Sequence, residues 1–276
     1  MHEIQLYSTK ENRTLNLVDN HYPDGSPLIT GGGFRTMLDS IDTMILRPRT
    51  LDQFVQGMFY CDAAEERGHP ISNLVIPHVP GGRQDRLNPS GDYLFTLKSV
   101  AKMINDRGFD KVVVLDPHSY VTPALIDRCH VISLESLLEG FWQGFSGVIA
   151  PDVGASKRGF DVARVLNIPF HQAEKHRDVS TGKLSGFAAP TIKSGEHYLV
   201  VDDICDGGGT FNGLAEVIHE KGCYASLFVT HGIFSQGTET LLNNYVTITT
   251  TESTTFPSPG ILKLPDTIER MIAWAL

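Results

Sequence analysis

The chain has few cysteines, no long apolar run and no excess of basic residues. No stretch approaches the about 20 apolar residues of a membrane span, and the charged segment 1–13 does not match the apolar core of a signal peptide. None of the cysteines forms a C-x-x-C pair, so neither a zinc ribbon nor a redox motif is predicted, and buried free thiols are expected. They are Cys61, Cys129, Cys205 and Cys223. We therefore expect a soluble, cytoplasmic protein.

Negative charge predominates. The sequence has 23 Lys and Arg against 32 Asp and Glu, which gives a net charge of −9. This balance argues against a nucleic-acid partner, because binding the nucleic-acid backbone requires a basic face. A local basic pocket for a small phosphorylated ligand stays compatible with it. With 276 residues, of which 41% are hydrophobic, the chain can form one large or two ordinary domains.

Short apolar runs alternate with amphipathic stretches. Buried strands are predicted at residues 73–77, 112–115, 147–150, 198–201 and 226–234. Helical spacing is found at residues 93–104, 160–166 and 211–218. Such alternation predicts an α/β fold with mostly parallel sheets flanked by helices. We place a domain boundary near Phe145, which gives domains 1–145 and 146–276. Residues 177–194 lack periodicity and are predicted to form a long mobile loop that acts as a lid.

A hydrophobic strand runs directly into paired acids and a glycine-rich turn at residues 200–210, Val-Val-Asp-Asp-Ile-Cys-Asp-Gly-Gly-Gly-Thr. Backbone N–H groups in such a turn, at the start of a helix, form a cradle for an anion. Asp202 and Asp203 would repel that anion, and they suit sugar hydroxyls or a magnesium ion beside it. The alternative interpretation is an ordinary strand-to-helix turn in which Asp206 caps the helix.

This string resembles the phosphoribosyl diphosphate-binding motif of type I phosphoribosyltransferases. The resemblance implies that a ribose phosphate is bound by Asp202, Asp203, Asp206, Gly207, Gly208, Gly209 and Thr210. Four further segments, in the same order as in the family, narrow the resemblance to the ribose-phosphate diphosphokinases. They are Arg83-Gln84-Asp85-Arg86, Asp116-Pro117-His118, Pro151-Asp152-x-Gly154 and Lys175-His176-Arg177. The resemblance implies two packed phosphoribosyltransferase-like domains, the first with the ATP motifs and the second with the phosphate loop and lid.

The family's site roles carry over to matching positions. ATP binding is implied for Arg83, Gln84, Asp85, Arg86 and His118, magnesium binding for His118 and Asp152, and a catalytic role for Lys175 and Arg177. The residue types suit this chemistry, because diphosphoryl transfer builds negative charge that Mg²⁺, Arg and Lys stabilise. Taken alone, His118 fits a hydrogen-bonded turn equally well, and Lys175 and Arg177 fit a solvated charged surface.

A further match lies near the start of the chain. Tyr22-Pro23-Asp24-Gly25 resembles a family loop, Phe-Ser-Asp-Gly-Glu, that reaches the adenine of a neighbouring subunit's ATP. Tyr22 could stack on the base and Asp24 could accept from its amine. A plain Pro-Asp-Gly turn explains the same residues. The resemblance also implies a homo-oligomer, a dimer or a hexamer.

The phosphate loop departs from the family pattern at Gly207, where the family has threonine in Asp-Thr-x-Gly-Thr. Glycine removes a hydroxyl donor and leaves room beside the 5′-phosphate. The default acceptor is ribose 5-phosphate, which would give PRPP for nucleotide biosynthesis. The alternative is ADP-ribose, whose 5-phosphate continues into a larger group and would place the enzyme in NAD biosynthesis or salvage. A phosphoribosyltransferase and a regulatory synthetase-like subunit are further alternatives.

Overall fold

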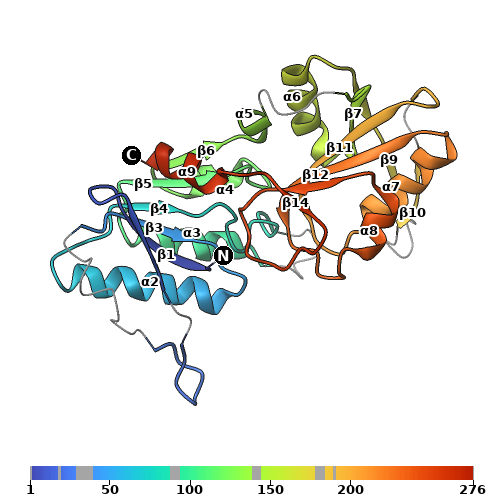
Figure 1. The fold of residues 1–276 in the computed structure, drawn as a ribbon. Helices are drawn as coiled ribbons and strands as arrows, with labels where there is room; N and C mark the ends of the chain where they lie inside the picture. The colour runs from blue at the N-terminus through green and yellow to red at the C-terminus, as the bar shows by residue number, and fades with distance from the viewer. Residues whose placement is uncertain are drawn as a thin grey trace. The chain divides into compact units, whose positions relative to one another are not determined.

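The computed structural model describes residues 2–17, 20–28, 40–87, 94–138, 144–177, 184–188 and 191–275, and only the backbone of 175–177 and 184–188. Its contacts divide the chain into two compact units (Figure 1). Unit 1 comprises Met1–Ile132, Ser253–Thr255 and Asp266–Leu276, and unit 2 comprises Ser133–Glu252 and Phe256–Pro265.

This division differs from the predicted domains 1–145 and 146–276 at both ends. The helix α5 (Leu134–Leu138) packs against α6 (Ser156–Leu166) of unit 2, so unit 2 begins before Phe145. The C-terminal helix α9 (Thr267–Ala275) packs on two strands of unit 1. Long-range packing of this kind leaves no mark in a local sequence pattern.

Unit 1 contains a six-stranded sheet in the order β2-β1-β3-β4-β5-β6. Its strands are β1 (Ile4–Ser8), β2 (Arg13–Asn16), β3 (Thr43–Leu46), β4 (Asn73–Val75), β5 (Lys111–Leu115) and β6 (Cys129–Ile132). From β3 to β6 the strands are parallel, whereas β1 runs antiparallel to β2 and β3. The strands predicted at 73–77 and 112–115 are confirmed as β4 and β5.

Helices cover both faces of this sheet. Apolar side chains of α2 (Leu51–Glu65) and α3 (Thr96–Asn105) share one core with alternate residues of the strands, such as Leu74 and Val112. The C-terminal α9 packs against β4 and β5 and lies on the other face from α2 in Figure 1. A short helix, α4 (Val121–Leu125), connects β5 to β6. Unit 1 therefore has the predicted layered α/β arrangement.

Unit 2 contains a six-stranded, fully parallel sheet in the order β14-β13-β12-β11-β7-β8. Its strands are β7 (Gly147–Ala150), β8 (Phe170–Gln172), β11 (His197–Cys205), β12 (Tyr224–Gly232), β13 (Ile248–Thr250) and β14 (Leu262–Lys263). Its further helical segments are η1 (Val153–Ala155), α7 (Gly209–Glu220) and α8 (Glu239–Asn244). The strands predicted at 147–150, 198–201 and 226–234 are confirmed, and β11 continues past the predicted end through the two acids to Cys205.

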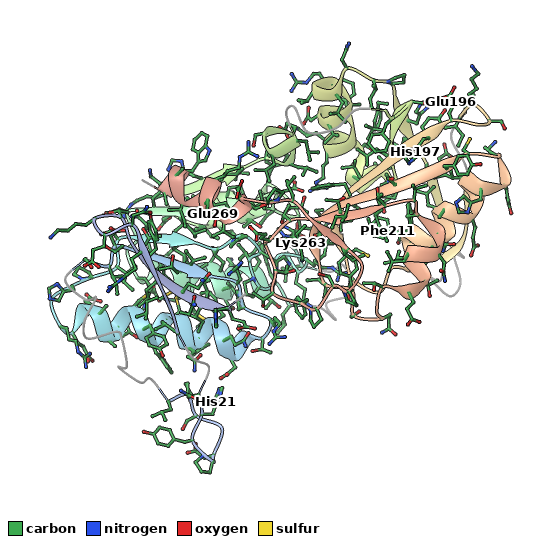
Figure 2. All side chains as sticks on the ribbon, viewed as in Figure 1. His21, Glu196, His197, Phe211, Lys263 and Glu269 are labelled. Atoms are coloured by element: carbon green, nitrogen blue, oxygen red, sulfur yellow. The ribbon has the colours of Figure 1, made fainter. Side chains whose placement is uncertain are left out.

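The core of unit 2 lies between α7 and the central strands. Phe211 and Leu214 of α7 pack with Val200 of β11 and Leu227 of β12. The buried hydroxyl of Tyr245 donates to the backbone oxygen of Phe211 over 2.7 Å, which ties the end of α8 to α7. Figure 2 labels His197 at the start of β11 and Phe211 in α7. This packing fixes α7 directly behind the carboxyl end of β11.

The segment predicted as a loop at 177–194 contains a strand. β9 (Glu174–Arg177) pairs antiparallel with β10 (Leu184–Ala188), so that Lys175 lies opposite Phe187. The loop prediction is wrong for these residues, because pairing between two short strands stabilises a conformation that neither segment's periodicity indicates. Residues 178–183 and 189–190 of the predicted lid lie outside the described residues. Across the described part of the chain, no helix is both long and apolar enough to span a bilayer.

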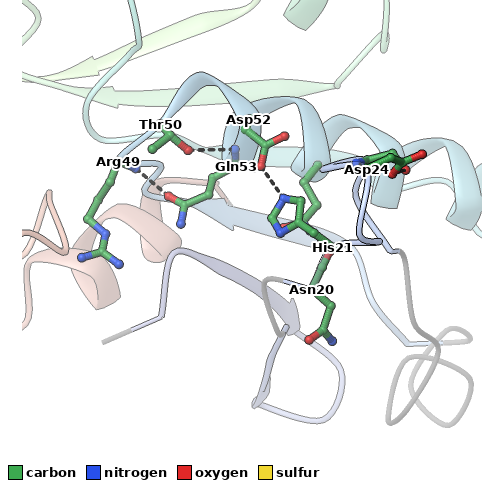
Figure 3. A network of polar contacts seen from close by, with 9 residues as sticks. Asn20, His21, Asp24, Arg49, Thr50, Asp52 and Gln53 are labelled. Atoms are coloured by element: carbon green, nitrogen blue, oxygen red, sulfur yellow. Dashed lines mark hydrogen bonds and ion pairs between the residues drawn. The ribbon is translucent and has the colours of Figure 1, made fainter.

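The start of α2 provides a test of local stability. The hydroxyl of Thr50 accepts from the backbone N–H of Gln53 over 3.2 Å, and the Gln53 side chain accepts from the N–H of Arg49 over 2.8 Å (Figure 3). Two N–H groups at the helix start are thereby satisfied. We expect Thr50→Ala to cost about 1 kcal/mol of unfolding free energy, measured by thermal unfolding. Thr50→Ser keeps the hydroxyl and is the matched control; equal losses in both variants would show that the cap contributes nothing.

Candidate functional site

The predicted site residues of unit 2 gather at the carboxyl edge of its sheet. β7 ends just before Asp152, and β11 contains Asp202 and Asp203 near its end at Cys205, before the glycine-rich turn. The two strands are adjacent and parallel, with Val200 opposite Ile149. Because parallel strands end at the same edge, both sets of polar groups lie there, where open parallel sheets bind ligands.

The acid pair is largely buried and lies near Arg158. Nη1 of Arg158, in α6, lies 3.5 Å from Oδ1 of Asp202 and 3.7 Å from Oδ1 of Asp203. The side chains of Asp202 and Asp203 are only 16% and 6% exposed. Burial, and then the neighbouring Asp203 charge, raise the pKa of Asp202 well above its ordinary value. The site therefore brings two neighbouring carboxylates and the Arg158 guanidinium together.

Arg158 was missed in the sequence. The only sequence feature that could have pointed to it is its position six residues after Asp152, near the start of a helix. The helical pattern emphasises the apolar face of α6 and says nothing about a polar side chain beside it. Only the packing of α6 against β11 reveals the contact.

The turn between β11 and α7 has the form expected of an anion cradle. Gly208 is the residue before the first turn of α7, with φ +77°, and no side chain caps this helix. The cap position of α7 is occupied by Gly208 and not by Asp206, whose Oδ1 accepts from the hydroxyl of Ser235 over 2.6 Å. The alternative interpretation of Asp206 as the helix cap therefore misplaces the cap, which lies two residues further along the chain. The N-terminal end of α7 retains the amides and the positive dipole end that favour an anion.

Only one of the three glycines is required by the backbone. Gly208 has a positive φ, and a Cβ there would lie 3.2 Å from a Leu241 methyl group. Gly207 is not among the positive-φ residues, and a Cβ there would make an ordinary 3.5 Å contact with Cγ of Gln236. A Cβ at Gly209 would meet nothing within 4 Å. Thr210 follows in the first turn of α7.

Asp152 has a structural task in the described contacts. Its Oδ1 accepts from the backbone N–H of Gly154 over 2.9 Å and of Ala155 over 3.3 Å, which caps η1. Within the described residues, no group of three or more His, Cys, Asp and Glu is arranged to hold a metal ion. The expected magnesium ligand Asp152 is therefore placed at the correct edge of the sheet, and its binding of the ion stays a prediction.

The predicted ATP-binding residues of unit 1 also come after the carboxyl ends of adjacent parallel strands. Residues 83–86 come after β4, and His118 comes after β5, which is paired in parallel with β4. Asp85 is buried, and its Oδ1 lies 3.2 Å from Nε of Arg86, whose side chain is 83% exposed. Arg83 is exposed as well, and so is His118. The contact allows Asp85 to orient Arg86, and both arginine side chains stay at the surface.

Gln84 is held by the start of α3. Its side-chain oxygen accepts a short hydrogen bond from the hydroxyl of Thr96, and its backbone oxygen accepts from the N–H of Leu97 over 3.3 Å. Through these two hydrogen bonds, Gln84 anchors the segment 83–86 to the start of α3. Its predicted contact with a nucleotide stays a prediction.

The segment 20–28 is a tight turn. The N–H of Tyr22 donates to the oxygen of Ser26 over 2.8 Å, and Asp24 Oδ1 accepts from the N–H and hydroxyl of Ser26 over 3.0 and 2.6 Å. These hydrogen bonds, the hydroxyl first, lower the pKa of Asp24. His21 Nε2 lies 2.6 Å from Oδ2 of Asp52 in α2 (Figure 3). The turn is satisfied by its own contacts, with the Tyr22 ring exposed.

The two residues predicted to be catalytic are described by their backbone alone. Lys175 and Arg177 both belong to β9, with Arg177 opposite Leu184 of β10. Their catalytic role stays a prediction.

Comparison with known proteins first defines the class. Residues 120–255 match the family model of the phosphoribosyl transferase domain. The crystal structure of phosphoribosylpyrophosphate synthetase from Mycobacterium smegmatis has the same fold, with a TM-score of 0.68 at 21% identity, over 83% of this chain and 80% of that one. The chain is thus a protein of the phosphoribosyltransferase fold, as its sequence predicts.

The curated relatives then narrow the similarity. The ribose-phosphate pyrophosphokinase of Pyrococcus furiosus is 27% identical over 80% of each chain. That of Pyrococcus abyssi is 26% identical over 83% of this chain and 80% of the relative, and that of Sulfurisphaera tokodaii is 25% identical over 89% and 86%. The chain is therefore an enzyme that is similar, over 80% or more of its length, to the ribose-phosphate pyrophosphokinases, a family of ATP-dependent diphosphotransferases.

The buried acid pair gives a prediction about stability and pH. An acid whose pKa is raised in the folded state binds protons more tightly there, so its ionisation destabilises the fold as the pH rises above its ordinary value of 3.8. Asp202→Asn removes this penalty and keeps the shape. We expect this variant to melt at a higher temperature than the parent at neutral pH, and the difference to shrink as the pH approaches 3.8.

The matched control is Asp106→Asn, which changes an exposed acid paired with Lys102 and should give no gain. Thermal unfolding over a range of pH measures both variants. A loss of stability in Asp202→Asn at neutral pH would mean that the contact with Arg158 outweighs burial and repulsion.

Proposed function

We propose that the enzyme transfers the diphosphoryl group of ATP to the anomeric hydroxyl of a ribose 5-phosphate moiety and releases AMP. Ribose 5-phosphate is the proposed acceptor, so that the product is PRPP, a precursor of nucleotides. The observation that carries the proposal is the uncapped, glycine-rich start of α7 beside the buried pair Asp202 and Asp203. The similarity to the ribose-phosphate pyrophosphokinases agrees with it.

The start of α7 suits the phosphate of a ribose phosphate, and the acid pair suits its ribose hydroxyls. The amides of residues 207–210 and the positive end of the α7 dipole attract the phosphate. Asp202 and Asp203 accept hydrogen bonds from the ribose hydroxyls, and these bonds to charged acceptors are stronger than those between neutral groups. Arg158 holds the two carboxylates in place. The anomeric hydroxyl is thereby oriented for attack on the β-phosphorus of ATP.

Magnesium fits the residues at hand. Mg²⁺ prefers oxygen ligands and is held by one or two carboxylates together with substrate phosphates and water. Asp152 is a half-buried carboxylate at the strand edge, and the acid pair offers two more. His118 is a nitrogen ligand and suits a hydrogen bond to the triphosphate better than direct contact with the ion. When bound, the ion neutralises phosphate charge during transfer.

The remaining roles complete the proposal. Arg83 and Arg86 bind the triphosphate through their exposed guanidinium groups, and Gln84 and Asp85 position them. Lys175 and Arg177 stabilise the charge that develops during transfer. We further propose that the protein is cytoplasmic and a homo-oligomer, a dimer or hexamer, in which Tyr22 and Asp24 contact the adenine bound by a neighbouring copy.

The nucleotide product tests the reaction type. With ATP, Mg²⁺ and ribose 5-phosphate, we expect AMP and a sugar that has gained two phosphoryl groups, in equal amounts, because the broken bond lies between the α- and β-phosphorus atoms. Nucleotide chromatography and mass spectrometry measure both. A reaction without acceptor is the control and should give no AMP. ADP with a singly phosphorylated product would refute diphosphoryl transfer, and no turnover at all would favour a regulatory subunit.

ADP-ribose is a second candidate acceptor, supported by Gly207. Neither its φ nor its neighbours require glycine, since a Cβ would only touch Gln236. Because the backbone does not require glycine at this position, we attribute the glycine to contact with the ligand. The missing side chain leaves space where the 5-phosphate of ADP-ribose continues into the second phosphate. This enzyme would then act in NAD biosynthesis or salvage.

Exchange of Gly207 separates the two acceptors. Gly207→Thr should raise kcat/KM for ribose 5-phosphate about tenfold through a new hydrogen bond to a charged group, and lower it for ADP-ribose by crowding. Gly208→Thr is the matched control: its positive φ and the Leu241 contact predict losses with both acceptors. Steady-state kinetics give the ratio of the two kcat/KM values. An unchanged ratio in Gly207→Thr would show that this position does not select the acceptor.

A further inference from the structure

A loop after β12 is fastened to the phosphate loop by four hydrogen bonds. The N–H groups of Ile233 and Phe234 donate to the oxygen of Cys205 over 2.9 and 3.1 Å, and the N–H of Ser235 donates to the oxygen of Asp206 over 3.1 Å. The Ser235 hydroxyl adds the 2.6 Å contact with Asp206. These bonds hold residues 233–237 beside the turn that begins α7.

The backbone of this loop is strained at Phe234, and the contacts of that residue keep it in the strained conformation. Phe234 has φ +50°, a conformation that non-glycine residues rarely adopt, and Gly237 has φ +79°. The Phe234 side chain is buried in the core of unit 2. Strained residues persist where the surrounding structure fixes them, and they gather at binding sites. The loop therefore presents its exposed tip, Ser235–Gly237, in a defined position.

Gln236 occupies this tip and lies against Gly207. Its Cγ is 3.5 Å from the place where a side chain at Gly207 would begin. The residue is exposed. Within the described part of the chain, no hydrogen bond of its amide is recorded. A side chain that carries two N–H donors thus lies beside the place that a side chain at residue 207 would occupy.

We propose that Gln236 binds the phosphoryl group at C5 of the acceptor and takes the place of the donor lost at Gly207. The inference rests on the proposed function, since it assigns a specificity-determining residue to the same site. Gln236 donates an amide N–H to a phosphoryl oxygen from the side of the loop opposite to the α7 amides. Because the amide is uncharged and reaches from outside the turn, it serves a terminal phosphate and one that continues into a diphosphate.

The test uses two substitutions of similar size. Gln236→Leu removes the donor, and Gln236→Glu replaces it with a negative charge that repels phosphate. We expect Gln236→Leu to raise the Kd of the acceptor about tenfold, Gln236→Glu to raise it further, and the KM for ATP to stay unchanged in both. Thr240→Ala, an exposed position in α8, is the control and should leave all values unchanged. Titration calorimetry with ribose 5-phosphate and with ADP-ribose, without ATP, measures Kd apart from turnover.

A rescue distinguishes ligand contact from a structural effect. In the Gln236→Leu background, Gly207→Thr should restore affinity for ribose 5-phosphate, because the threonine hydroxyl returns a donor to the same place. Unchanged Kd values in Gln236→Leu, or a parent protein that binds neither acceptor, would overturn the inference. Acceptor binding that depends on Gln236 in a protein that forms no AMP would support the inference and refute the proposed reaction. If AMP is formed at the same rate in all Gln236 variants, the proposed reaction would be supported and the inference about Gln236 would be refuted.

Discussion

Two carboxylates lie side by side at the buried end of β11, and the rest of the site depends on how their charge is held. Asp202 and Asp203 both lie near Arg158, whose Nη1 is 3.5 and 3.7 Å from their Oδ1 atoms. Moving a charge away from water costs several kcal/mol, and the raised pKa of Asp202 reflects this cost. Ligands that bring hydroxyl donors or a cation to this pair would lower the cost of its charge.

The turn from β11 to α7 places a positive helix end close to the two acids. β11 ends and α7 begins within a few residues, so a negative pair and the positive end of a helix dipole lie at one edge. A ligand with hydroxyls at one end and phosphate at the other matches this arrangement. The net charge of −9 does not conflict with anion binding, because backbone amides, rather than lysine, form the cradle.

Sequence patterns predicted the strands and the strand-end chemistry because both are local. Apolar runs such as 112–115 and 198–201 are long enough to be recognised, and polar residues directly after them are placed by the strand itself. The hairpin of β9 and β10, the return of α9 to unit 1 and the contact of Arg158 depend on partners far away in sequence. The same holds for Asp206, whose carboxylate accepts from Ser235, while the cap position of α7 falls at Gly208.

The glycine triplet shows where sequence and structure each contribute. In sequence, all three glycines at residues 207–209 suggest close approach of a phosphate, and only the comparison with the family pattern sets Gly207 apart. In the structure, only Gly208 needs glycine for its φ of +77°, whereas Gly207 has room for a side chain next to Gln236. Gly208 is therefore required by the turn itself, whereas the turn leaves room for a side chain at residue 207. In the proposed reaction the acids and the helix dipole would act on the part of the ligand that every acceptor shares. Discrimination between acceptors would then come from the edge of the cradle, where residue 207 meets the loop after β12.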